Sequence, residues 1–344
     1  PWNYFCHYGD TTLLREHYQG MKHWVEYLQT RTDDKGIVVR EEPNGWCLGE
    51  WSTPHNRIEI PASLVNTAYF YHVTCIMADV AGILNKKNDE HHLRTLAETI
   101  RKNFNAAFYN EATHHYGEGK QGADVFALAF GLVPDGKREK VFAALLGHLE
   151  KVNYHFDTGI LATPLLLQVL TENGRADLAY KLMNQRDFPS YGYLADKKNN
   201  TLWETWNGDG NDEGCGHCHP MFGSVVAWFY HSLAGIKPDQ SDPGMKHFYI
   251  EPMIVPDLKY CRATYDSQYG KISSDWKIDE NGNLNIKIEV PANTSATVII
   301  PDWGGRTVLE SEKPVSEVSN IVIDKVDSAW MEVSSGVYHF VILK

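Results

Sequence analysis

One carboxylate in the sequence lies between two tryptophans, in residues 201–206 (TLWETW). Indole rings beside a carboxylate suit a sugar, because its C–H faces stack on rings while its hydroxyls need polar partners. In such a setting Glu204 can polarise a water molecule, or act as an acid if its pKa is raised. The alternative is a helix-capping or salt-bridged Glu204 beside two core tryptophans, and the residue types alone leave both interpretations open.

The loop after this segment contains a second group of reactive side chains, Cys215-Gly-His-Cys218-His219. Its C-x-x-C-H spacing matches a c-type haem attachment motif, but the motif lies in a loop of an otherwise large helical region. A structural zinc site needs four ligands, and no second C-x-x-C follows. We therefore expect no cofactor and no metal.

Helices are the elements that must position these residues. Apolar residues recur at helical spacing in eight stretches, at residues 14–28, 64–80, 93–108, 122–132, 137–152, 159–172, 174–186 and 221–235. Gly and Pro residues separate most of the stretches. Helix pairs that follow one another along the chain predict a helical toroid or solenoid.

The pattern changes after Gly235. Residues 237–244 (KPDQSDPG) read as a linker, and short runs of alternating apolar residues follow. Asn281-Gly282 between two of these runs is a hairpin signal. We predict a helical domain over residues 1–238 and a small antiparallel β-sandwich over residues 239–344.

Charge and hydropathy exclude two classes of partner. The 344 residues include 32 Lys+Arg and 44 Asp+Glu, which gives a net charge of −12. An acidic surface repels phosphate backbones, so we expect no nucleic acid partner. The longest apolar stretch has about nine residues, near 125–133, whereas a membrane span needs about 18. We expect no membrane partner, and the chain shows no targeting segment.

Several segments, in register, resemble the bacterial α-L-rhamnosidases of glycoside hydrolase family 78. That family shows P-S-W/Y-G-Y, T-x-W-E-x-W, N-H-P-M-F-G-S and A-G-I segments, which stand here at residues 189–193, 201–206, 218–224 and 234–236. Further matches in the family's order lie at residues 1–2, 9–11, 49–51, 64–69, 131–134 and 173–180. The likeness covers essentially the whole chain.

The resemblance implies an (α/α)6 barrel, a six-hairpin toroid of about twelve helices, followed by a β-sandwich. With about eight helices in sequence, we expect this barrel to lack its first helices. In the family, an acidic D-E-R-x-x-W-x-G-D segment supplies the general acid and lies just before the P-W pair with which this chain begins. The nearest acidic cluster, residues 40–43 (REEP), lacks that pattern. We therefore expect a fragment without the general acid.

The resemblance also implies a reaction and its residues. The expected reaction is inverting hydrolysis that releases terminal L-rhamnose from a rhamnose-containing glycoside or oligosaccharide. Glu204 matches the family's general base, which orients the attacking water. Trp51 matches a tryptophan of the sugar pocket, Trp2 matches another, and His219 matches a histidine that binds sugar hydroxyls. Core packing is the alternative for Trp2 and Trp51, and a helix-start cap is the alternative for His219.

Four further residues are expected in or beside the substrate site. Trp203, Trp206 and Tyr191 are assigned to the pocket wall or its scaffold. Glu50 stands where the family has the Asp of G-D-W, and its extra methylene keeps the charge but moves it. Cys218 replaces the usual Asn before His-Pro, which removes a hydrogen-bonding amide.

Two functions from other classes compete with this interpretation. The missing acidic segment is compatible with a catalytically silent carbohydrate-binding or structural fragment. Another sugar-active (α/α)6 enzyme, such as an epimerase or a different glycosidase, is the third possibility. Calorimetry with rhamnose beside an aryl-rhamnoside assay separates the first two, and a panel of aryl glycosides tests the third.

Overall fold

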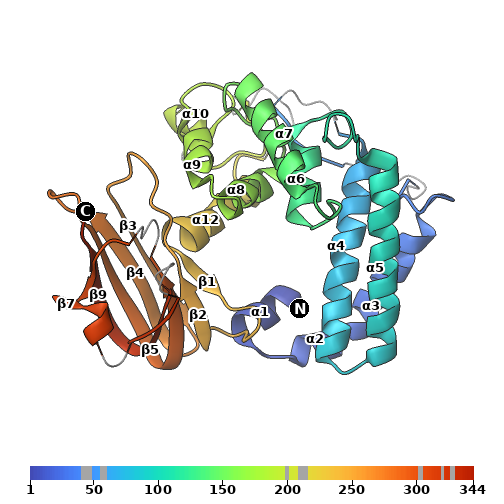
Figure 1. Ribbon diagram of the computed structural model, residues 1–344. Coiled ribbons are helices and arrows are strands. Elements are labelled where there is room, and N and C mark those ends of the chain that lie inside the picture. The colour runs from blue at the N-terminus through green and yellow to red at the C-terminus, as the bar shows by residue number, and fades with distance from the viewer. Residues whose placement is uncertain are drawn as a thin grey trace. The chain divides into compact units, whose positions relative to one another are not determined.

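The structure is a computed structural model that describes residues 1–39, 49–54, 60–197, 201–207, 216–300, 305–318, 321–325 and 330–344 (Figure 1). These residues form two compact units, one of residues 15–225 and one of residues 1–14 together with 226–344. The acidic cluster at 40–43 and Cys215 lie outside the described residues. The predicted domain boundary at residue 238 stays a prediction.

The first unit is built from helices. Their bounds are α3 Tyr18–Thr30, α4 Ala62–Ile83, α5 Lys87–Phe108, α6 Gln121–Ala129, α7 Arg138–Lys151, α8 Ala162–Glu172, α9 Ala176–Asn184, α10 Tyr191–Asp196 and α11 Pro220–Gly223. Two short helices, α2 Thr12–Glu16 and α12 Val225–Trp228, lie at the ends of this stretch. Within the described part of the chain, no helix is long and apolar enough to cross a membrane.

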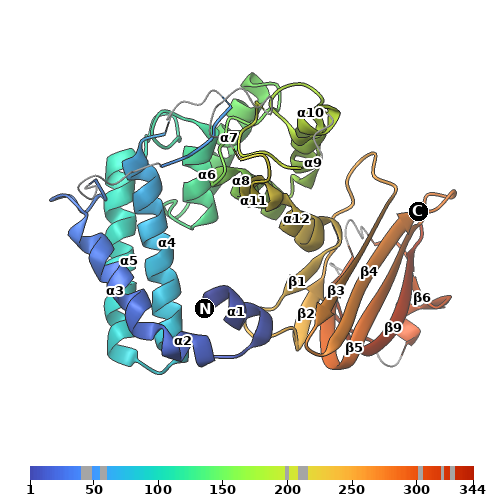
Figure 2. The ribbon, with the colours of Figure 1, turned by 180° about the vertical axis from the view of Figure 1, so that it is seen from behind.

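Helices α4 and α5 show how apolar spacing builds the pairs. In α5 the buried residues are Leu93, Ala97, Ile100 and Phe104, which recur at intervals of three and four and therefore lie on one face. In α4 buried residues lie on several sides of the helix. The amphipathic helix thus packs against the more apolar one, and the two run side by side in both views (Figure 2).

The last predicted helix, over residues 221–235, is broken in the structure. It consists of α11, α12 and a π-helical turn at Phe229–Leu233. Gly223 and Ser224, both weak helix formers, fall where α11 ends and α12 begins. The predicted stretch is therefore helical over most of its length, with a turn at Ser224 and a change to π geometry from Phe229.

The second unit contains helix α1 Trp2–Tyr8 and a sheet of nine strands. The strands are β1 Ile236–Pro238, β2 His247–Ile250, β3 Tyr260–Ser267, β4 Gly270–Ile278, β5 Leu284–Ile299, β6 Val308–Glu310, β7 Lys313–Pro314, β8 Ile321–Lys325 and β9 Trp330–Ile342. The order along the sheet is β1-β2-β5-β9-β6-β7, with β4 also on β5, β3 on β4 and β8 on β9. Among the described strands, every pair is antiparallel except β2 with β5, which is parallel.

The predicted hairpin at Asn281-Gly282 is confirmed. Strands β4 and β5 pair with Ile278 opposite Leu284, and the Gly282 N–H donates to the carbonyl of Asp279 at 3.0 Å. Gly282 has a φ of 84°, which glycine adopts without strain. The turn therefore fixes the register in which alternate residues of β5 point into the core of the sheet.

Candidate active site

The Glu204 carboxylate is held by one donor on each oxygen. Its Oε2 accepts a hydrogen bond from the Gly216 N–H at 2.7 Å. Its Oε1 accepts from the indole N–H of Trp51 at 3.3 Å. Both side chains are half-buried. Glu204 therefore lies in a fixed orientation beside the indole of Trp51.

Backbone pairing brings the two halves of this segment together. The Glu204 N–H donates to the carbonyl of Gly216 at 2.9 Å, and the His219 N–H donates to the carbonyl of Leu202 at 2.9 Å. Residues 202–204 therefore lie alongside residues 216–219. This pairing places the His219 ring near the carboxylate. Both groups lie beside Gly216: a Cβ added there would be 3.3 Å from Glu204 Oε2 and 3.7 Å from the His219 ring.

These contacts hold Glu204 in its ionised form. The Gly216 N–H lowers the pKa of Glu204 below its usual 4.5 more than any other contact does, and the Trp51 indole and the charge of His219 lower it further. Partial burial opposes them. A carboxylate with a lowered pKa is charged at neutral pH, so it is suited to accept a proton and not to donate one.

The backbone of Trp51 is held by the loop before helix α8. The Ile160 N–H donates to the carbonyl of Trp51 at 2.9 Å. In the same loop the carbonyl of Thr158 accepts from the indole N–H of Trp206 at 2.9 Å. Residues 158–160 thus connect Trp51, which contacts Glu204, to Trp206.

Glu50 is buried, with 1% of its surface exposed. Its Oε1 accepts hydrogen bonds from the N–H groups of Gly159, at 2.5 Å, and Ala162, at 3.2 Å. Its Oε2 is also buried and has no hydrogen-bond partner among the described residues. Burial raises the pKa of Glu50 to about 8 against these two donors, with a smaller contribution from the charge of Asp157. The carboxyl contacts the start of α8 and is closed to solvent.

The second indole of the segment belongs to the core. Trp206 is 0% exposed, with its ring centroid 4.9 Å from that of Phe156 and 4.4 Å from that of Phe222. Tyr191 packs edge-on against Trp206, and its hydroxyl donates to the carbonyl of Phe222 at 2.9 Å. Trp206 has no exposed face for a sugar to stack on, so of the two roles predicted for it, pocket wall or scaffold, its burial supports the scaffold.

Two other predicted residues have different surroundings. Trp203 is half-buried and stacks on the His217 ring, with the centroids 4.4 Å apart and the planes 17° from parallel. Trp2 belongs to the unit of residues 1–14 and 226–344, where its ring centroid lies 5.8 Å from that of Phe5. Both stay predictions for substrate binding, whereas Trp51, Glu204 and His219 are brought together.

Sequence reasoning missed the residues whose backbone holds the site. Gly216 supplies the strongest contact to Glu204, and Gly159 supplies a donor to Glu50. An added Cβ on Gly159 would lie 1.8 Å from the carbonyl oxygen of Trp51. The sequence shows Gly216 in a polar loop twelve residues after Glu204. It does not reveal which main-chain N–H donates to a given side chain.

Metal binding at the Cys/His loop has no support among the described residues. No group of three or more His, Cys, Asp and Glu side chains there could hold a metal ion. Cys218 is an exposed free thiol, and the other cysteine of the C-x-x-C-H motif, Cys215, lies outside the described ranges.

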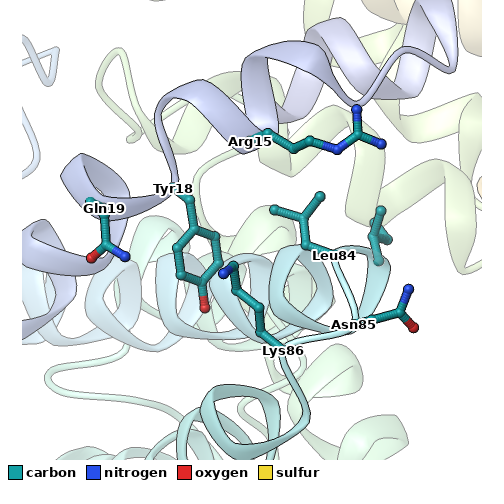
Figure 3. Close-up of a pocket in the computed structure, with 7 residues that line it drawn as sticks. Arg15, Tyr18, Gln19, Leu84, Asn85 and Lys86 are labelled. Atoms are coloured by element: carbon teal, nitrogen blue, oxygen red, sulfur yellow. The ribbon is translucent and has the colours of Figure 1, made fainter.

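A hollow elsewhere on the helical unit is separate from this site. It has a volume of about 440 Å³ and is lined by Arg15, Tyr18, Gln19, Ile83, Leu84, Asn85 and Lys86 (Figure 3). The ammonium of Lys86 lies over the Tyr18 ring, 4.6 Å from its centroid. None of the lining residues is among those that surround Glu204.

Comparison with known families gives two matches along the chain. A profile described as the bacterial alpha-L-rhamnosidase 6 hairpin glycosidase domain matches residues 1–233. A second, described as the bacterial alpha-L-rhamnosidase C-terminal domain, matches residues 235–314. The two matches meet close to the linker that the sequence predicted.

Individual relatives agree with the family profiles. An alpha-L-rhamnosidase of Formosa agariphila is 29% identical over 99% of this chain and 37% of its own length. The crystal structure of Streptomyces avermitilis alpha-L-rhamnosidase complexed with L-rhamnose is 31% identical, with a TM-score of 0.87 over 99% of this chain and 32% of that one. The alpha-L-rhamnosidase from Dictyoglumus thermophilum is 32% identical, with a TM-score of 0.89 over 100% of this chain and 38% of that one. The chain thus spans about a third of the length of these relatives.

Proposed function

Because the chain belongs to the bacterial α-L-rhamnosidase family, we propose that it forms part of the active site of an inverting glycoside hydrolase that releases terminal L-rhamnose. In this proposal Glu204 is the general base, and Trp51 and His219 contact the sugar. Trp203 and Tyr191 belong to the wall or the scaffold of the sugar site, and the sugar-binding role expected for Trp2, which lies in the other unit, stays a prediction.

The state of the Glu204 carboxylate carries the proposal. Each of its oxygens accepts a hydrogen bond, from Gly216 and from Trp51, and these contacts lower its pKa. A base in hydrolysis must be unprotonated at the start of the reaction, and it must keep its lone pairs directed at one water. A half-buried, oriented and ionised carboxylate beside an indole meets both requirements.

Glu204 removes a proton from water as the water oxygen bonds to the anomeric carbon, and the bond from that carbon to the leaving oxygen breaks. A carboxylic acid on the other side of the sugar gives its proton to the leaving oxygen, and the two carboxyls stand about 6.5–9.5 Å apart. Glu204 is the base of that pair, and no segment of this sequence matches the family motif that supplies the acid.

A Glu204→Gln substitution tests the assignment, assayed on an aryl α-L-rhamnoside in the protein as the cell produces it. Removal of a general base lowers kcat by about 10²–10⁴-fold, because the amide cannot accept the proton. Glu98→Gln, a surface change 72% exposed at the side chain, is the matched control. Proton NMR of the first product gives the stereochemistry, and inversion predicts the β-anomer. Unchanged turnover by Glu204→Gln removes the base assignment.

A binding measurement separates the enzyme from a silent sugar-binding protein. Titration calorimetry with L-rhamnose is carried out beside the rhamnoside assay on the same preparation. Turnover together with binding supports the hydrolase. Binding without turnover instead supports the silent carbohydrate-binding alternative that the sequence left open.

A further inference from the structure

The buried carboxyl of Glu50 has no direct part in the proposed reaction. It is 1% exposed, so it cannot contact a substrate that enters from solvent. One oxygen accepts from two backbone N–H groups, and the other has no hydrogen-bond partner in the described part of the chain. A buried polar atom without a hydrogen bond lowers the stability of the fold. Such an atom in a native structure therefore calls for an explanation.

Glu50 is linked to Glu204 through the segment that begins α8 and through Trp51. Glu50 binds the N–H groups of Gly159 and Ala162, which lie on either side of the peptide that binds Trp51: the Ile160 N–H donates to the Trp51 carbonyl at 2.9 Å. The Trp51 indole then donates to Glu204. The carboxyl of Glu50 and the carbonyl of Trp51 therefore hold the loop before α8 and the first residue of that helix at three points.

The packing around this loop leaves little alternative placement. An added Cβ on Gly159 would lie 1.8 Å from the Trp51 carbonyl oxygen and 2.8 Å from Glu50 Oε1. Real side-chain carbons do not approach other atoms so closely, so residues 50–51 and the loop are in direct backbone contact. A displacement of the loop would therefore move the Trp51 main chain with it.

We propose that Glu50 is a positioning residue, which clamps the loop before α8 against Trp51 and thereby sets the direction of the Trp51 indole N–H toward Glu204. The inference deepens the proposed function and rests on it for the identity of the base. The clamp needs only an acceptor at Oε1, because Oε2 binds nothing among the described residues.

A neutral carboxyl suits this clamp. Burial raises the pKa of Glu50 to about 8, so the group is protonated at neutral pH. Among the described residues, the ionisable groups that face it are Asp157, from the chain before α8, and Tyr69 on α4, whose own pKa is raised by burial and by Glu50. Neither offers a positive charge to stabilise an ionised Glu50.

Two substitutions distinguish the hydrogen bonds that Glu50 accepts from its negative charge. Glu50→Gln keeps an acceptor at Oε1 and is neutral, and we expect kcat on an aryl α-L-rhamnoside to stay within about threefold of the unsubstituted protein. Glu50→Ala removes the acceptor, and we expect kcat to fall about 10–100-fold with KM changed less, as a displacement of about 1 Å near a reacting group does. Equal loss in both variants, or no loss in Glu50→Ala, overturns the proposal.

A double substitution tests the route through Trp51. If Glu50 acts on Glu204 through this indole, Glu50→Ala raises the pKa of Glu204 and moves the acid limb of the kcat profile to higher pH. The double variant Glu50→Ala with Trp51→Phe should then have the same acid limb as Trp51→Phe alone, because the effects of substitutions at coupled residues do not add. Additive displacement of the limb would show that Glu50 acts by another route, such as general loss of stability.

A structural measurement keeps the inference separate from the proposed function. In a crystal structure of Glu50→Ala, the distance from Trp51 Nε1 to Glu204 Oε1 should lengthen from 3.3 Å beyond hydrogen-bonding range, while in Glu50→Gln it should not. An unchanged distance in Glu50→Ala refutes the clamp whatever the activity is. If the unsubstituted protein has no rhamnosidase activity and binds no rhamnose, the proposed function fails, and this distance still decides whether Glu50 positions Trp51.

Discussion

Replacement of Trp51 by phenylalanine removes one of the two donors to Glu204 and keeps most of the ring. The bond that is lost is the indole N–H to Glu204 Oε1, at 3.3 Å. Hydrogen bonds to charged groups contribute about 1.5–3 kcal/mol at good geometry. This one is longer than the usual 2.9–3.0 Å and is half-exposed, so we expect about 1 kcal/mol, at the low end.

The loss has two measurable effects on turnover. About 1 kcal/mol corresponds to a roughly fivefold lower kcat at neutral pH, if the bond acts mainly by holding the base in place. The pKa of Glu204 rises, because a contact that favours its charged form is gone. Since the base works only when ionised, the acid limb of the kcat profile moves to higher pH. Both are read from kcat on an aryl α-L-rhamnoside across the acid range.

Trp203→Phe is the matched control. Trp203 is the neighbouring indole and stacks on the His217 ring, and it has no hydrogen bond to Glu204 among the described contacts. We expect its acid limb to stay in place. If the limb of Trp51→Phe moves to lower pH or does not move, or if Trp203→Phe moves it equally, the indole N–H does not tune Glu204 and the reasoning is refuted.

Three further predictions concern the groups around this bond. Gly216→Ala places a carbon 3.3 Å from Glu204 Oε2 and should lower kcat by up to about tenfold, while Gly223→Ala, which meets nothing closer than 3.8 Å, should not. Trp206→Phe removes a buried N–H donor and should lower the free energy of unfolding in urea by about 2–4 kcal/mol. Because Glu50 stays protonated up to about pH 8 when folded but only to 4.5 when unfolded, its contribution to stability is complete below pH 4.5. That contribution declines by roughly 5 kcal/mol as the pH rises to 8, and Glu50→Gln should abolish this decline in thermal unfolding.

Apolar spacing was sufficient to find the long helices. Periodicity predicted α4 and α7 to within three residues at each end, and α5 apart from its first six residues, because a buried stripe must recur every three to four positions whatever the partner is. It missed α1 and α10, which have seven and six residues and too few turns to show a period. The six-hairpin domain and the C-terminal sheet domain, which the motif resemblance implied, are confirmed by the family matches.

The candidate site was predictable in its side chains and not in its main chain. The sequence motifs identified Glu204, Trp51 and His219 as candidates, and these three residues lie close together in the structure. The donors of Gly216 and Gly159 could not be found, because every residue except proline has an N–H and only the fold decides which carboxylate it meets. The expected charge on Glu50 was likewise changed by burial, which depends on distant segments.

The N–H of residue 216 has a consequence for how this site tolerates change. Since a peptide group and not a side chain binds Glu204 Oε2, the amino acid at this position is restricted by bulk, and only proline is excluded by chemistry. Position 51 is restricted in the opposite way, because a ring of similar size without an N–H keeps the bulk and loses the donor to Glu204. Saturation libraries at the two codons should therefore rank their variants differently: activity should follow side-chain volume at the first, and the presence of a ring N–H at the second.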